Sequence, residues 1–213
     1  METSIQTLAI SALPIIFAIT LHEAAHGYVA RMFGDPTAWK LGRVSLNPLR
    51  HIDPVGTILL PAVTYLLSGF MFGWAKPVPV NFGKLRNPKK DMLWVALAGP
   101  GANLLMALAW ATLLKLVMGR AEFQFSEALR QMALAGIAVN GMFMVLNLLP
   151  LLPLDGGRIM VSLLPQRAAW KFAQTERYGM WILILLLLTH VLDAILRPMI
   201  GLFLTLIESI FGF

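Results

Sequence analysis

Long apolar runs separated by short polar segments dominate this sequence. The first, third and fourth runs are long enough to cross a hydrocarbon core of about 30 Å as helices that rise about 1.5 Å per residue. The fifth run is near that limit. The sixth is short and follows Arg197-Pro198, where the chain is expected to break, so it is either a short tilted span or the end of a kinked one. The pattern predicts an all-α polytopic membrane protein with about five or six transmembrane helices. In order, the six runs cover about 5–33, 54–72, 92–118, 131–152, 178–196 and 198–213.

The second run, 54–72, allows two interpretations. Lys and Arg collect in cytoplasmic loops, so a full span would place one of its two basic flanks outside. A re-entrant segment keeps both flanks on one face, and such segments are tolerated where protein buries them. We therefore favour a re-entrant segment and keep a full span as the alternative. The basic flanks are Arg31, Lys40, Arg43 and Arg50 before the run, and Lys76, Lys84, Arg86, Lys89 and Lys90 after it.

Two short segments beside this run predict extended chain at the membrane surface. Residues 40–47 alternate weakly between polar and apolar and end in Asn47-Pro48. Residues 76–81 contain Pro77 and Pro79, which exclude a helix and suit an edge strand. Small surface β-strands complete the predicted fold.

Composition agrees with a membrane protein. The 213 residues are 58% hydrophobic and 13% charged, whereas a soluble domain has about 25% charged residues. The length suits one domain, 1–213, rather than two. The chain has no cysteine, which excludes disulfides and thiolate metal sites. The net charge of +6 is explained by membrane topology, and no nucleic-acid partner is expected.

The first apolar run carries the sequence His22-Glu23-Ala24-Ala25-His26. Helical residues four apart share a face, so His22 and His26 can reach one metal ion. Glu23 sits beside them, where its carboxylate can hold or deprotonate a metal-bound water. Ionisable groups at membrane depth are expensive and functional by default. The alternative is a pair of buried histidines bonded to neighbouring helices, which explains neither the spacing nor the adjacent glutamate.

A catalytic zinc usually has three protein ligands, so a third is needed. Asp155 stands out among the candidates because prolines break the fourth run before it and Gly156-Gly157 gives backbone freedom after it. Unwound backbone at membrane depth is allowed where it lines a buried site. Asp155 as the cap of the next helix is compatible with ligation and stays open. The other candidates are His51 and Asp53, which a local turn capped by Asp53 explains better, and His190 and Asp193, which suit an interfacial pair.

Three motifs together resemble the site-2 protease family of intramembrane zinc metalloproteases. They are His22 to His26 in one apolar run, Ala98 to Asn103 opening a later one, and Asn147 to Gly157 ending the next. Their order and spacing match the family over about 8–33 and 92–165, which we take as the catalytic core. The commoner family plan adds an earlier span and a PDZ-like or nucleotide-sensing domain. We expect a minimal form with neither.

The resemblance implies one zinc ion held by His22, His26 and Asp155, with Glu23 as general base. It also implies hydrolysis of a peptide bond in or near a transmembrane segment of membrane-protein substrates. Asn147 and Pro150 match family positions near the substrate. Asn103 is expected to bond either a neighbouring helix or the substrate backbone.

The predicted topology places this chemistry near one face of the membrane. With 54–72 re-entrant, the motifs around Glu23 and Asp155 both lie near the cytoplasmic face, in a multi-pass protein expected in a prokaryotic cell membrane. The partners are then the lipid bilayer and transmembrane-helix substrates, with the oligomeric state open. One alternative is a catalytically inactive zinc-binding membrane scaffold, which would not need Glu23. The other is a metal transporter, which would need polar groups across several spans.

Overall fold

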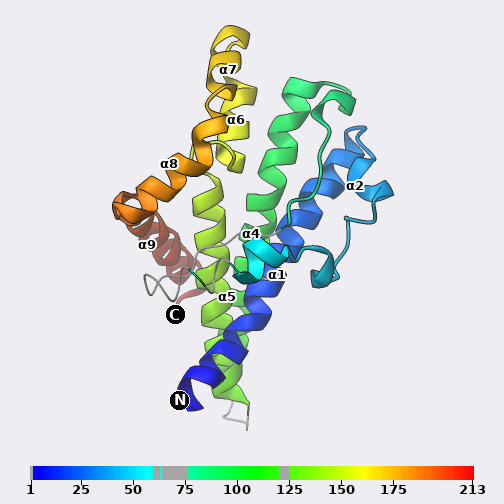
Figure 1. The fold of residues 1–213 in the computed structure, drawn as a ribbon. Helices are drawn as coiled ribbons and strands as arrows, with labels where there is room; N and C mark the ends of the chain where they lie inside the picture. The colour runs from blue at the N-terminus through cyan, green and yellow to red at the C-terminus, as the bar shows by residue number, and fades with distance from the viewer. Residues whose placement is uncertain (1, 60–62, 64–75, 120–124) are drawn as a thin grey trace.

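The computed structural model describes residues 2–59, 63, 76–119 and 125–213, and within these ranges the fold is a helical bundle without strands (Figure 1). Among the described residues, four helices are long and apolar enough to cross a membrane, by length and composition: the Ile10–Met32 part of α1 (Glu2–Met32), α4 (Pro88–Met118), α5 (Ser126–Asn147) and α9 (Val191–Phe211). The all-α membrane fold is confirmed. The expected five or six spans are not reached in the described ranges. The shorter helices are α2 (Thr37–Lys40), η1 (Pro48–Arg50), η2 (Pro54–Leu59), η3 (Phe82–Lys84), α6 (Asp155–Leu163), α7 (Gln166–Ala173) and α8 (Glu176–Leu188).

The bundle is built around α1, α4 and α5. The helices α1 and α5 run in the same direction and α4 runs back between their ends, while α9 packs against α4 and α5 (Figure 1). Small residues allow close approach, as in other membrane helices: Ala107, Ala111 and Ala133 are fully buried in the core that α9 covers. Gly136 of α5 lies directly against the ring of Trp110. This arrangement brings the C-terminal ends of α1 and α5 to the same end of the molecule.

The C-terminal helices break at a different place from the one predicted. The chain turns between Leu188 and Val191, where His190 adopts a left-handed φ of 58° and the Thr189 hydroxyl donates to the Leu185 carbonyl. Pro198, the expected break, lies inside α9. Prolines are tolerated inside membrane helices where neighbours satisfy the freed carbonyl. The 13 residues of α8 are too short to cross a bilayer alone.

The predicted surface strands are absent from the two described segments, 40–47 and 76–81. Residues 40–47 form turns and irregular chain, while 76–81 is extended but pairs with no strand among the described residues. Val78 N–H donates to Glu23 Oε2 (2.7 Å) and Asn81 N–H to Asp35 Oδ2 (2.6 Å). Side-chain acceptors thus take the hydrogen bonds that a partner strand would have taken, and the prolines have no N–H to give. We call residues 76–81 the strap.

Most of the 54–72 run lies outside the described residues, but its flanks do not. Lys76 N–H donates to the His51 carbonyl over 2.9 Å, so the residues that flank the run lie next to each other. A single crossing would separate the two flanks by about 30 Å. A re-entrant segment needs flanks that lie together; the path of the run itself lies outside the described residues and stays a prediction.

Candidate metal centre

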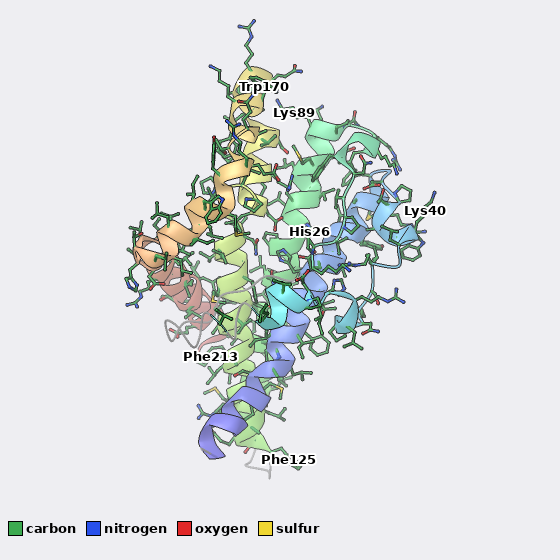
Figure 2. All side chains as sticks on the ribbon, viewed as in Figure 1. His26, Lys40, Lys89, Phe125, Trp170 and Phe213 are labelled. Carbon is green, nitrogen blue, oxygen red and sulfur yellow. The ribbon has the colours of Figure 1, made fainter. Side chains whose placement is uncertain are left out.

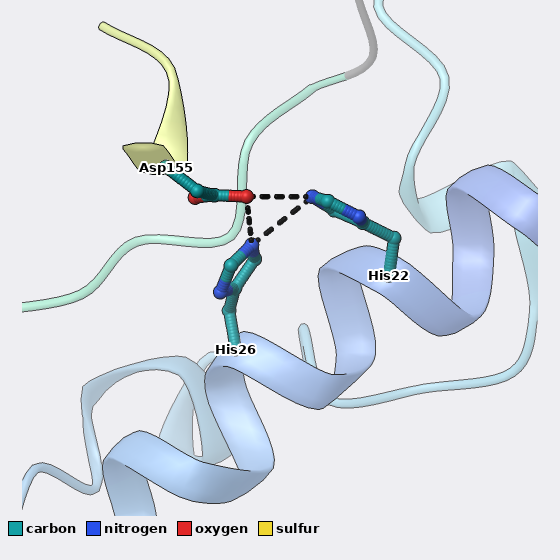
Figure 3. A group of neighbouring side chains, drawn as sticks. All are labelled: His22, His26 and Asp155. Carbon is teal, nitrogen blue, oxygen red and sulfur yellow. Dashed lines mark hydrogen bonds and ion pairs between the residues drawn. The ribbon is translucent and has the colours of Figure 1, made fainter. Parts of the chain in front are cut away.

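Two helices bring three potential metal ligands to one point. His22 and His26 project from α1, and Asp155 is the first residue of α6 (Figure 3). The Nε2 atoms of the two histidines are 3.1 Å apart, and Asp155 Oδ2 lies 3.2 Å from His22 Nε2 and 3.3 Å from His26 Nε2. The histidines are 8% and 9% exposed, and Figure 2 shows His26 inside the bundle. These residues are the ligand set implied by the sequence motifs.

Hydrogen bonds on the far side of each imidazole fix which nitrogen faces the cluster. His22 Nδ1 lies 2.6 Å from Asn103 Oδ1, and His26 Nδ1 lies 2.7 Å from the Val95 carbonyl oxygen. Both partners are acceptors, so each Nδ1 carries a hydrogen, and the neutral form of each ring directs its Nε2 lone pair into the cluster. Asp155 Oδ2 is buried and has no hydrogen bond within the described part of the chain. Three electron-pair donors therefore converge, and a cation among them removes their repulsion.

The geometry fits a zinc ion. Tetrahedral zinc with bonds of about 2.0–2.1 Å places its ligand atoms about 3.3 Å apart, close to the three observed separations. Gly99 of α4 provides the space, since a Cβ there would lie 2.6 Å from His22 Nε2 and closer still to His26 Nε2. A glycine at this point thus leaves a cradle beside the two nitrogens. Two histidines and a carboxylate are also a ligand set found in catalytic zinc sites.

A compact turn aims Asp155 at the histidines. The helix α5 ends at Asn147, and α6 begins seven residues beyond the Leu148 cap with Asp155 in its first turn. A Cβ at Gly156 would lie 2.5 Å from the Leu148 carbonyl carbon, so α6 can pack directly on the preceding turn only because this residue is glycine. Gly156 therefore serves close packing rather than an unusual backbone angle. No side chain caps α6, so the capping role for Asp155 is not observed.

The other predicted residues lie around this cluster with different surroundings. Glu23 is next to His22 in the sequence and partly buried, and the strap N–H of Val78 occupies its Oε2. Asn147 donates to the Phe143 carbonyl of its own helix (3.0 Å), and Pro150 is exposed at the turn before Asp155. Asn103 is fully buried, and its amide bonds neighbouring helices. This is the first of the two expected roles, and it leaves Asn103 no surface to offer a substrate.

The remaining candidates stay outside the cluster. Asp53 Oδ1 accepts from the N–H groups of Val55 (3.0 Å) and Gly56 (2.7 Å), which confirms the predicted capping turn. His51 is buried and bonds the Ser45 carbonyl (2.9 Å). His190 and Asp193 form a pair at 3.7 Å, with the histidine 85% exposed. Among the described residues, the cluster that can hold a metal is His22, His26 and Asp155.

Sequence reasoning missed Asn140, a fully buried polar residue in the middle of α5 that bonds Asn103 over 3.0 Å. The available signal was an amide inside an apolar span, since polar groups at membrane depth need partners and are often functional. The Val95 carbonyl that holds His26 carries no such signal, because every residue has a carbonyl.

Comparison with known proteins places the chain in a family. A Bacillus subtilis (strain 168) protein named "Putative zinc metalloprotease YwhC" is 40% identical over 190 residues, which cover 88% of this chain and 84% of that protein. The chain belongs to the site-2 protease family. Its resemblance in the three motifs is thereby confirmed, and zinc is the metal that the family implies for His22, His26 and Asp155.

More distant relatives carry a similar name. "Putative zinc metalloprotease Rip2" of Mycolicibacterium smegmatis is 32% identical over 84% of this chain and 66% of that protein. The Rip2 protein of Mycobacterium tuberculosis H37Rv is 26% identical over the same shares. No protein-family model matches the chain, and no solved structure matches it. The relatives support a bacterial metalloprotease, and the four long apolar helices indicate a membrane protein.

Proposed function

We propose that this chain is an intramembrane zinc metalloendopeptidase of the site-2 type, which hydrolyses a peptide bond in or near a transmembrane segment of membrane-protein substrates. One observation carries the proposal. The histidine pair of a helix long enough to cross the membrane meets Asp155, which lies 129 residues beyond His26 in the sequence, and Glu23 stands beside that pair. A site of this kind inside a membrane helix suits substrates that are themselves membrane helices.

In this proposal the metal ligands and Glu23 have separate roles in peptide hydrolysis. When bound, zinc polarises the scissile carbonyl and lowers the pKa of water to about 7. His22, His26 and Asp155 would hold the ion. Glu23 takes the proton of the attacking water and passes it to the leaving amine, as a general base and then a general acid. Val78 N–H engages Glu23 Oε2, so we assign the proton transfer to Oε1.

The strap contributes to the site by holding Glu23 rather than by offering a free strand edge. A helical substrate must unwind locally before attack, and an exposed strand could pair with the unwound backbone. The N–H groups of Val78 and Asn81 are already bonded to Glu23 and Asp35. Strand addition at these two positions requires both bonds to open first.

The deciding experiment is cleavage of a model transmembrane substrate by the purified protein in detergent. We expect cleavage that a chelator removes and added zinc restores. Glu23→Gln should lose cleavage and keep stoichiometric zinc, because it removes the base and leaves the three ligands. Zinc binding without cleavage by the wild type would favour the scaffold, and zinc flux into liposomes would favour the transporter. Loss of zinc in Glu23→Gln would give Glu23 a ligand or structural role instead.

A further inference from the structure

A chain of buried side-chain amides runs from α5 through α4 to the metal centre on α1. Asn140 Nδ2 donates to the Gly136 carbonyl (2.8 Å), and Asn103 Nδ2 donates to Asn140 Oδ1 (3.0 Å). Asn103 Oδ1 then accepts from His22 Nδ1 (2.6 Å). Both asparagines are 0% exposed. We call Asn140 and Asn103 the amide relay.

The Gly136 carbonyl fixes the orientation of both amides of the relay. A backbone carbonyl can only accept, so the Asn140 amide must turn its nitrogen to Gly136 and its oxygen to Asn103. Asn103 must then turn its nitrogen to Asn140 and its oxygen to His22. The Ala18 carbonyl, 3.2 Å from Asn103 Nδ2, supports the same orientation. The polarity imposed by one carbonyl of α5 thus reaches the imidazole of α1 through two amides.

The two histidines of the cluster differ in how they are held. A backbone carbonyl, which cannot be turned round, accepts the Nδ1–H of His26. The partner of His22 is an amide with a donor end and an acceptor end. A reversed Asn103 would present an NH₂ group to Nδ1, and the hydrogen of His22 would move to Nε2, the atom that must face the metal. The tautomer of His22 therefore depends on how the Asn103 amide is oriented, whereas the partner of His26 has only one orientation.

We propose that Asn140 is a positioning residue of the metal centre, which acts through Asn103 to keep His22 Nδ1 protonated and Nε2 directed at the metal. The proposal rests on the proposed function only in taking zinc as the metal. Packing alone does not explain an amide at this position, because an apolar side chain would fill the same space inside a span without the cost of burying polar atoms.

The test replaces Asn140 by leucine, which has nearly the same shape and removes both hydrogen bonds. Zinc affinity, measured in detergent by competition with a chelating dye, should fall about ten- to a hundredfold, the usual effect of losing the partner of a ligand. Nitrogen NMR of histidine-labelled metal-free protein should show a changed tautomer population for His22 and none for His26. Ile137→Ala, at another buried position of α5, is the packing control and should keep the zinc affinity.

A double-substitution cycle separates the relay from a general loss of stability. Asn103→Leu alone should weaken zinc binding at least as much as Asn140→Leu, and the double variant should lose little more than Asn103→Leu, because the two residues act in series. Asn140→Ala gives the same readouts if the leucine variant does not fold. Unchanged zinc affinity and His22 signals in a folded Asn140 variant would overturn the proposal. Normal zinc binding by a wild type that cleaves nothing would instead overturn the proposed function and leave the relay standing.

Discussion

At the scale of single residues, Gly99 is a position of the candidate site where a larger side chain would not fit. A Cβ at this position would lie 2.6 Å from His22 Nε2 and closer still to His26 Nε2, in the space that a bound metal would need. Gly99→Ala should therefore abolish stoichiometric zinc and cleavage while leaving the helix intact, since alanine is the better helix former. Gly101→Ala is the matched control, because a Cβ there meets nothing within 4 Å. Metal analysis of both purified variants decides, and normal zinc in Gly99→Ala would remove the cradle from the site.

Asp155 gives a second test at this scale, between ligation and capping. Its carboxylate faces the two imidazoles and caps no helix. Asp155→Asn keeps the shape and the capping ability but offers a neutral amide, a poor zinc ligand. We expect loss of bound zinc and of cleavage, measured on the same preparation. A variant that retains both would return Asp155 to the role of a helix cap.

The sequence pointed to the three residues of the candidate metal site, but not to the groups that hold them in place. His22, His26 and Asp155 stand in motifs because zinc requires particular atoms at particular spacings. Asn140 and the Val95 carbonyl were not predicted, since which groups meet an imidazole depends on how α4 and α5 pack against α1. That packing follows from three-dimensional contacts among small residues and leaves only a faint trace in one sequence.

At the scale of elements, Asp35 ties the strap to the end of α1. It is fully buried and accepts from Asn81 N–H (2.6 Å) and Thr37 N–H (3.0 Å). Burial raises the pKa of Asp35, but the hydrogen bonds from Thr37 and Asn81 outweigh it and hold the pKa below the ordinary 3.8. A carboxyl whose pKa is lowered by folding stabilises the fold above its unfolded pKa, and this contribution is lost as the pH falls through its folded pKa.

Asp35→Asn should therefore lower the thermal stability of the purified protein at pH 7. The difference from wild type should start to shrink below the ordinary pKa of about 3.8, where the unfolded carboxyl takes up a proton, and should disappear as the pH falls through the lower pKa of the folded carboxyl. Thermal unfolding in detergent at several pH values measures this. Asp193→Asn, at a largely exposed surface pair, should show a much smaller effect at pH 7. A difference for Asp35→Asn that does not change with pH would mean that the charge of Asp35 is unimportant.

The long helices followed from hydrophobicity, and the details between them did not. The proline signal misplaced the last break because Pro198 is accommodated inside α9, while the left-handed turn at His190 has no comparable mark in the sequence. The strap has the composition of an edge strand, yet acceptors from distant side chains, Glu23 and Asp35, take its N–H groups. Such pairings are set by tertiary contacts and override local propensity.

At the scale of the whole molecule, the direction of the helices explains how the site closes. The helix α1 and the helix α5 run the same way, so the histidines near the end of one meet the aspartate beyond the end of the other (Figure 1). Lys40 and Lys89 lie toward the end of the molecule where α1 and α5 finish. Phe125, which lies between α4 and α5 in the sequence, is at the opposite end (Figure 2). The charge bias of membrane proteins predicts that the lysine-bearing end faces the cytoplasm.

The orientation can be measured because the chain has no cysteine. Cysteines placed singly at Lys40 and Lys90, two exposed residues on either side of the 54–72 run, should resist an impermeant thiol reagent in intact cells and react after lysis. A cysteine at Phe125, which is 62% exposed, should react in intact cells and serves as the control for the opposite face. The expected pattern joins two requirements, the charge bias and the bond between His51 and Lys76 that brings the flanks together. Reaction of only one lysine position in intact cells would mean that the run crosses the membrane, and a reversed pattern at all three positions would place the metal centre toward the outside.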